Sequence, residues 1–182
     1  AVPVARTIDR FVCGYAVATV DEGLKLRRHG IEKEILCLGP VSAGRYQECL
    51  ENDISLPMFE YRRAKELSDA AVAEGKTAKI HIAVDTGMSR IGLFPDEGSV
   101  ETVKEIAELP ALRIAGMFTH FARADEADKT KAGEQYRRFH AFCDAVKAAG
   151  VEVPVCHCSN SAGIVELPDF NMDAVRAGIT IY

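Results

Sequence analysis

The chain has 182 residues, 48% of them hydrophobic, and a formal net charge of −5. This length suffices to bury a substantial core, and we expect one compact domain. Acidic and basic residues are interspersed, which argues against the clustered basic surface that nucleic acids and acidic membranes require and favours small-molecule chemistry.

The sequence also bears on cellular context. No stretch approaches the ~20 apolar residues that span a bilayer, and the start lacks a secretory signal pattern, so we expect a cytosolic protein. The six cysteines lie in apolar contexts, where free cysteine behaves as a small buried hydrophobe, and no disulfides are expected. Because the first residue is alanine rather than an initiator methionine, we expect the chain to be a piece of a longer protein.

Short apolar runs alternate with longer stretches of helical period, which is typical of βα units around a parallel sheet. In the first part of the chain we predict a helix over 4–10, a strand over 14–18 and a helix over 20–29 that opens with a capping box of Thr19 and Glu22. A strand over 35–38, a helix over 43–52, a strand over 54–59 and a helix over 61–74 follow.

The alternation continues in the second part. Strands are predicted over 79–85, 112–118, 155–158 and 175–182, with helices that end at Leu109 and Gly150 and a short helix near 162–166. In the strand over 79–85, the period of two places Ile80 and Ile82 toward the helices and His81 toward the interior. The polar segment 124–131 is expected to form a loop over the active face.

Seven predicted strands are one short of the eight that close a (β/α)8 barrel of the TIM type. We therefore predict such a barrel, here missing its first strand, which would precede Ala1. Active sites of these barrels lie at the C-terminal ends of the strands, and phosphate groups commonly bind after strands seven and eight. The polar residues that follow the predicted strands are Arg90, His120, Asn160, Ser161 and, in the last strand, Arg176 and Gly178.

Residues that follow or end the last two predicted strands are typical of an anion-binding site. Backbone N–H groups of Ser161, Gly178 and Ile179, with the Ser161 hydroxyl, could hold a phosphate, although an ordinary turn with a capping serine has the same pattern. Arg176 favours the phosphate interpretation. The alternative for Arg176 is a structural ion pair with a buried carboxylate.

The remaining candidates each have a structural alternative. Arg90 follows a turn in which Gly87 supplies positive φ, and it either faces the pocket or is a solvated surface arginine. His120 is either a ligand contact or a core histidine bonded to a carbonyl. Strand alternation sends Cys156 and Cys158 to one face and His157 to the other, which argues against a zinc site and favours His157 as inward-facing support.

The chain contains the motifs YAVATVDEGLKLR, HIAVDTGMSRIG, GMFTHFARAD, HCSNSAG and FNMDAVRAGITIY, in this order and over essentially its whole length. Together these five motifs resemble the pyridoxal-phosphate barrel domain of bacterial alanine racemases. The resemblance implies that residues 1–182 are most of an N-terminal barrel domain, that the cofactor is pyridoxal 5′-phosphate, and that the parent enzyme interconverts L- and D-alanine. By the same analogy the enzyme is a cytoplasmic homodimer that feeds D-alanine to the peptidoglycan of the cell wall.

The resemblance also implies roles for individual residues. It places Arg90 against the phenolic oxygen of the cofactor, His120 against the ring face, and His157 beside Arg176 as its support. Arg176 would donate a hydrogen bond to the pyridine nitrogen. The resemblance also places Asn160, Ser161, Gly178 and Ile179 around the phosphate of the cofactor.

The family uses two bases, a cofactor-bearing lysine on the first strand and a tyrosine from the C-terminal β domain of the partner subunit. Neither is expected within residues 1–182, so we predict that this piece alone neither binds the cofactor covalently nor racemises alanine. Ala83 stands where several family members have a lysine, often carbamylated, that helps to hold the arginine corresponding to Arg90. A serine racemase of the same architecture and a non-catalytic pyridoxal-phosphate barrel protein are the alternatives.

Overall fold

A single curved sheet of parallel strands organises the molecule. The computed structural model describes residues 1–182, and its six strands follow one another in chain order across the sheet. Every neighbouring pair is parallel. The strands are β1 (Gly14–Val17), β2 (Glu34–Cys37), β3 (Ile54–Met58), β4 (Ala78–Ala83), β5 (Leu112–Phe118) and β6 (Cys156–His157).

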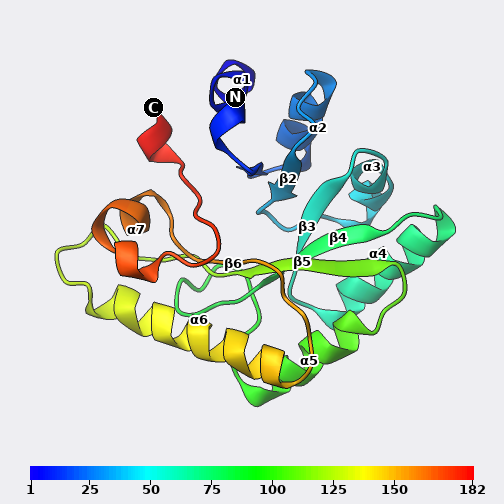
Figure 1. Cartoon of the computed structure of the whole chain (residues 1–182). Helices are drawn as coiled ribbons and strands as arrows, with labels where there is room; N and C mark the ends of the chain where they lie inside the picture. The colour runs from blue at the N-terminus through cyan, green and yellow to red at the C-terminus, as the bar shows by residue number, and fades with distance from the viewer.

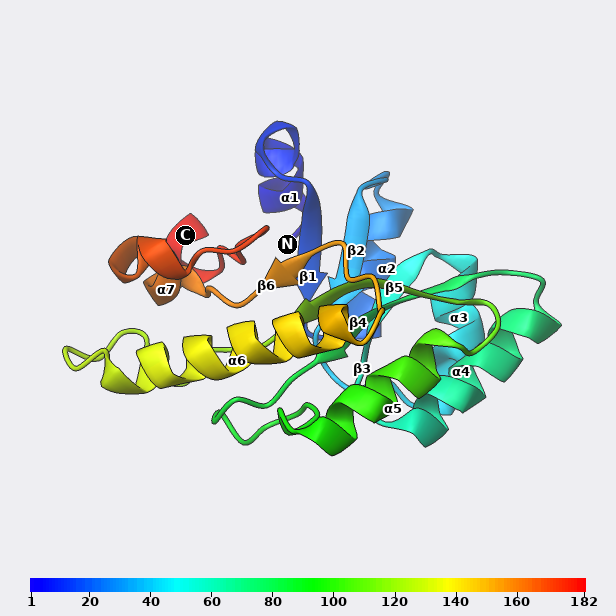
Figure 2. The same cartoon turned by 60° about the horizontal axis from the view of Figure 1, so that its bottom comes forward.

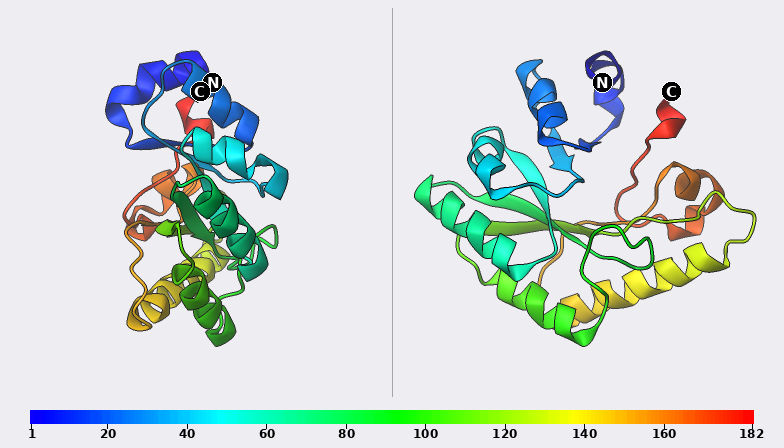
Figure 3. Two further views of the ribbon diagram at one scale, coloured as in Figure 1. Left: turned by 90° about the vertical axis from the view of Figure 1, so that its right-hand side faces the viewer. Right: turned by 180° about the vertical axis from the view of Figure 1, so that it is seen from behind.

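Seven helices accompany the strands, and those that lie between the first and the last strand in the chain connect the strands and cover the outer face of the sheet. The seven helices are α1 (Val2–Ile8), α2 (Val20–Arg28), α3 (Tyr46–Glu51), α4 (Tyr61–Ala73), α5 (Glu97–Ala107), α6 (Thr130–Ala148) and α7 (Ser161–Glu166), with short 3₁₀ turns η1 (Asp9–Phe11), η2 (Ala43–Arg45), η3 (Pro168–Phe170) and η4 (Ile179–Ile181). Figure 1 shows α2 to α6 in an arc around the sheet, and Figure 2 shows α4, α5 and α6 side by side. The structure is thus a partial α/β barrel whose two chain ends lie on the same side (Figures 1 and 3).

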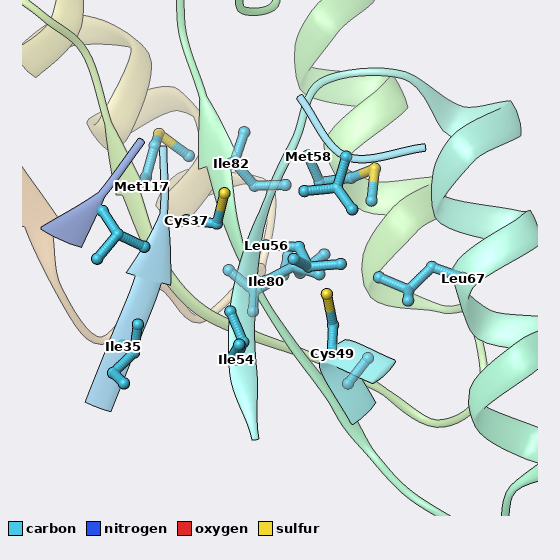
Figure 4. Close-up of a cluster of buried hydrophobic side chains, with 14 of the residues drawn as sticks. Ile35, Cys37, Cys49, Ile54, Leu56, Met58, Leu67, Ile80, Ile82 and Met117 are labelled. Atoms are coloured by element: carbon cyan, nitrogen blue, oxygen red, sulfur yellow. The ribbon is translucent and has the colours of Figure 1, made fainter. Parts of the chain in front are cut away.

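The core fills the space between the outer face of the sheet and these helices. Ile80 and Ile82 of β4 are completely buried and pack with Leu67 of α4 in one cluster (Figure 4), as the strand period predicts. Burying each such side chain contributes roughly 1.5–3 kcal/mol. His81 points to the opposite, concave face, where it meets polar groups.

Local signals set several boundaries as expected. The hydroxyl of Thr19 accepts a hydrogen bond from the Glu22 N–H at 3.4 Å, and the Glu22 carboxylate accepts one from the Thr19 N–H at 3.3 Å, so the capping box is confirmed. Each bond satisfies a backbone donor that the first turn of a helix leaves free. The helix before Gly150 begins at Thr130, so the loop expected over 124–131 is two residues shorter than predicted.

The strand predicted over 175–182 is wrong. Only Ala174 pairs with β6, as an isolated bridge to His157, and Gly178 leaves the extended conformation at φ −125° and ψ −97° before η4 begins. Ile179 and Tyr182 are 82% and 86% exposed, so their apolar character does not reflect burial in this structure. The strand predicted over 79–85 ends at Ala83, because Asp85 enters a turn. No helix has the length and apolar character needed to cross a membrane.

Candidate active site

The segment after α7 delivers Arg176 to the C-terminal ends of β5 and β6. Ala174 bridges to His157, and the Arg176 N–H donates to the Ser159 carbonyl at 2.9 Å, so the backbone runs along β6 without forming a full strand. The arginine side chain therefore enters the concave face of the sheet, where the predicted site residues from β5 and β6 converge.

Five acceptors surround the two terminal nitrogens of Arg176. Nη1 donates to Nδ1 of His157 at 2.6 Å and to its carbonyl at 3.1 Å. Nη2 donates to the carbonyls of Thr119 at 2.7 Å and Cys158 at 3.2 Å, and lies 3.4 Å from Nδ1 of His120. Nε is buried and has no hydrogen-bond partner. The predicted association of Arg176 with His157 is present, and His120 belongs to the same cluster.

Burial, with a smaller effect of neighbouring positive charges, lowers the pKa of both histidines and keeps them neutral. Burial, followed by the positive charges of Arg176 and Arg90, lowers the pKa of His120 to about 4. Burial, followed by Arg176 and then His81, lowers the pKa of His157 to about 2. Burial lowers the pKa of Arg176 to about 10, opposed in part by Cys158 and assisted to a lesser extent by the charge of Arg90, so the guanidinium remains a cation at neutral pH.

Ser161 ties the end of the chain to the start of α7. Its hydroxyl oxygen accepts from the Gly178 N–H at 3.0 Å, the Thr180 N–H at 3.4 Å and the Thr180 hydroxyl at 3.3 Å. Ile179 lies between these two residues with an exposed side chain, so only its backbone borders the cluster. The predicted neighbours Ser161 and Gly178 are therefore in direct contact.

The Asn160 side chain is hydrogen-bonded within the protein, whereas the Arg90 side chain has no partner. The Asn160 side chain accepts from the Gly163 N–H at 3.0 Å and donates to the Phe121 carbonyl at 3.3 Å, so it caps α7 in this structure. Arg90 is exposed and makes no hydrogen bond or ion pair, although its charge reaches His120 and Arg176.

A rigid turn carries Arg90. One carboxylate oxygen of Asp85 accepts from the Gly87 N–H at 2.9 Å and the Ser89 N–H at 3.0 Å. Gly87 has φ +136°, a region that favours glycine, which confirms the positive φ predicted there.

Some groups of the site are not predicted from the sequence. The carbonyls of Thr119 and Cys158 are backbone atoms and carry no sequence signal, whereas Thr180 lay in a segment read as a strand. Cys156 and Cys158 join the hydrophobic core while His157 faces Arg176, as alternation predicts.

Known proteins resemble this chain in sequence and in fold. Residues 1–182 match the family model described as "Alanine racemase, N-terminal domain". The chain belongs to this family. It is 45% identical to an alanine racemase of Clostridium novyi over 175 residues, and this matched region covers 96% of this chain and 45% of that protein. An alanine racemase of Clostridium tetani is 40% identical over 167 residues, covering 92% of this chain and 43% of that protein.

Solved structures of alanine racemases share the fold. The alanine racemase of Clostridium difficile 630 in complex with cycloserine superposes with a TM-score of 0.98 at 36% identity, over 100% of this chain and 50% of that chain. The enzyme of Streptomyces coelicolor A3(2) gives 0.92 at 30% identity, again over 100% and 50%. The chain thus spans about half the length of the alanine racemases it matches. The resemblance recognised in the sequence is confirmed.

Proposed function

We propose that this chain is the cofactor-binding part of a racemase that interconverts L-alanine and D-alanine with pyridoxal 5′-phosphate. One observation carries the proposal: in a chain of the alanine racemase family, the Nε donor of Arg176 is buried without a partner. An unpaired buried donor costs about 1–3 kcal/mol, so this atom calls for an acceptor. The nitrogen of a pyridine ring is such an acceptor.

The other residues of the site fit the phosphate of this cofactor. Three donors converge on the Ser161 oxygen, which has only two lone pairs. Phosphate oxygens are stronger acceptors than a hydroxyl, and they would engage the N–H groups of Gly178 and Thr180 while Ser161 donates its own proton. Asn160 and Ile179 flank this group and would complete the phosphate contacts.

Arg176 would hold the ring nitrogen by a hydrogen bond without giving up its proton, since its pKa stays well above neutral pH. Pyridoxal phosphate, when bound, supplies an electron sink that acidifies the Cα–H bond of an amino acid. A ring nitrogen left unprotonated is a weaker sink than a pyridinium. Arg176 would thus favour return of the proton to Cα over other reactions.

His120 and Arg90 would contact different parts of the cofactor, the first as a neutral ring and the second as a cation. His120 is neutral, so it can lie against the ring face without adding a third positive charge beside Arg176 and Arg90. Arg90 is a free cation at the rim and would hold the phenolic oxygen of the cofactor. With a buried alanine at position 83, its anchor must come from another group.

The whole protein would be a cytoplasmic homodimer. We propose a complete (β/α)8 barrel, whose first strand would carry the cofactor-bearing lysine, followed by a C-terminal β domain whose tyrosine reaches the partner subunit. Its product, D-alanine, would serve peptidoglycan synthesis.

Chiral chromatography of the full-length protein with pyridoxal phosphate and L-alanine tests this function. We expect D-alanine to form, and Arg176→Leu to weaken cofactor binding about tenfold or more through loss of a hydrogen bond from a charged group. Faster conversion of L-serine would identify a serine racemase. Cofactor binding with no racemisation of either amino acid would identify a non-catalytic binding protein.

A further inference from the structure

Four side chains form a continuous hydrogen-bonded line across the concave face of the sheet. Oε1 of Glu34 on β2 lies 3.3 Å from Nε2 of His81 on β4. Nδ1 of His81 lies 3.0 Å from Nε2 of His157 on β6, and Nδ1 of His157 lies 2.6 Å from Nη1 of Arg176. His81 and His157 are only 6% and 4% exposed, so little water competes for the two bonds that His157 makes, whereas the Glu34 side chain at the end of the line is 42% exposed.

The chemistry of the end groups fixes every proton in this line. A guanidinium nitrogen only donates, so Nδ1 of His157 must accept, and its proton sits on Nε2. That proton points at Nδ1 of His81, which must also accept, so the proton of His81 sits on Nε2 and is donated to Glu34. Both rings are therefore neutral Nε2–H tautomers, and every bond is donated in the direction from Arg176 to Glu34.

The sheet is built to let the two rings meet across an intervening strand. His81 is in register with Gly116 of β5, one residue out of step with the Ile80–Ile114 pair, so β5 carries a bulge at this point. A Cβ atom on Gly116 would lie 2.6 Å from Nδ1 of His81. Residue 116 must therefore lack a side chain for His81 to reach His157.

The carboxylate end of the line is held in its charged form. Oε1 of Glu34 accepts a second hydrogen bond, from the Ser55 hydroxyl, at 3.0 Å. The hydrogen bond from His81 is the main cause that lowers the pKa of Glu34 to about 2, although partial burial opposes it. A fixed acceptor at this end denies His81 the opposite tautomer.

We propose that Glu34 and His81 are positioning residues that lock the tautomer of His157 and so hold Arg176 with its free Nε toward the cofactor's ring nitrogen. This role rests on the proposed function. Reversal of the His81 tautomer would put a proton on Nδ1 of His157, facing the N–H of Arg176. Two donors cannot share that 2.6 Å contact, so the arginine would have to move.

The proton arrangement is tested first without cofactor, by ¹⁵N NMR of the imidazole nitrogens in the full-length protein labelled on histidine. We expect neutral Nε2–H tautomers for both His81 and His157 in the wild-type protein. Glu34→Leu removes the acceptor and is expected to populate the other tautomer of His81, whereas Glu34→Gln keeps a carbonyl acceptor and should retain the wild-type tautomer. Glu32→Leu, at an exposed glutamate whose side chain makes no hydrogen bond or ion pair, is the matched control.

The positioning role is tested on the same proteins by titration with pyridoxal phosphate. We expect Glu34→Leu to weaken binding about tenfold, as for a lost hydrogen bond to a charged group, and Glu34→Gln and Glu32→Leu to change it less than twofold. A wild-type proton on Nδ1 of either ring overturns the proposal, as does unchanged cofactor affinity in Glu34→Leu. If the wild-type protein binds no pyridoxal phosphate, the proposed function fails with the positioning role, while the tautomers measured without cofactor still decide the proton arrangement.

Discussion

The Nδ1 atom of His81 lies 2.6 Å from the position that a Cβ atom on Gly116 would occupy, and the Val155 carbonyl oxygen lies 2.7 Å from the same point. The carbonyl belongs to the backbone and cannot rotate away. We therefore expect Gly116→Ala to lower the free energy of unfolding by roughly 1–3 kcal/mol, as overpacking does.

Urea denaturation measures this change. Gly44→Ala is the control, because nothing lies within 4 Å of a Cβ atom at that position, and it should shift stability by less than ~0.5 kcal/mol. Equal stability of the two variants would show that β5 tolerates a side chain beside His81.

Stability should depend on pH through His120 and His157. Their pKa values in the folded protein, about 4 and about 2, lie below the ordinary value of 6.5. Between 6.5 and each lowered pKa the unfolded chain binds more protons than the folded one, so the free energy of unfolding falls as the pH falls through this window. Above pH 6.5 this contribution is fully present.

The variant His120→Gln isolates one of these contributions. It should reduce the slope of unfolding free energy against pH between about pH 6.5 and about pH 4, measured by urea denaturation at steps across that window. An unaltered slope would mean that His120 is protonated as readily in the folded protein as in the unfolded one.

Loss of the Ser161 hydroxyl should weaken the proposed phosphate site. Ser161→Ala removes the hydroxyl that would donate a hydrogen bond to the phosphate, and that also holds Gly178 and Thr180 in place, so we expect about tenfold weaker binding of pyridoxal phosphate by the full-length protein. Fluorescence titration measures the dissociation constant. Ser42→Ala, at an exposed serine whose side chain makes no capping bond, should bind like the wild type, and a matching loss there would indicate a non-specific effect.

Residues 1–182 on their own should not bind the cofactor covalently. Lys25, Lys65 and Lys104 lie on α2, α4 and α5, which cover the outer face of the sheet, and the last two pair with Asp69 and Glu101. Borohydride treatment with pyridoxal phosphate followed by mass spectrometry should therefore show no stoichiometric adduct. One pyridoxyl group on a single lysine would refute this expectation.

Sequence reasoning worked where a local rule acts alone. The period of two assigned Ile80 and Ile82 to the core and His81 to the other face, and the pair of Thr19 and Glu22 located the start of α2. It failed at 175–182, because an apolar run forms a strand only if a neighbouring backbone pairs with it, and here pairing stops after Ala174.

Contacts within the site depend on features that no local pattern encodes. The family resemblance implied that His157 lies beside Arg176, but the line from His157 to Glu34 needs the shift in register between β4 and β5. The carbonyl of Thr119 reaches Arg176 only because β5 ends beside β6. Both are consequences of tertiary structure.

The strands follow chain order across the sheet, so each βα unit docks on an edge made by the segment synthesised just before it. Such nearest-neighbour assembly suits folding during translation, because no unit waits for a distant part of the chain. The contact between Arg176 and His157 joins the segment after α7 to β6, so it can form only after the βα units that precede both have been synthesised.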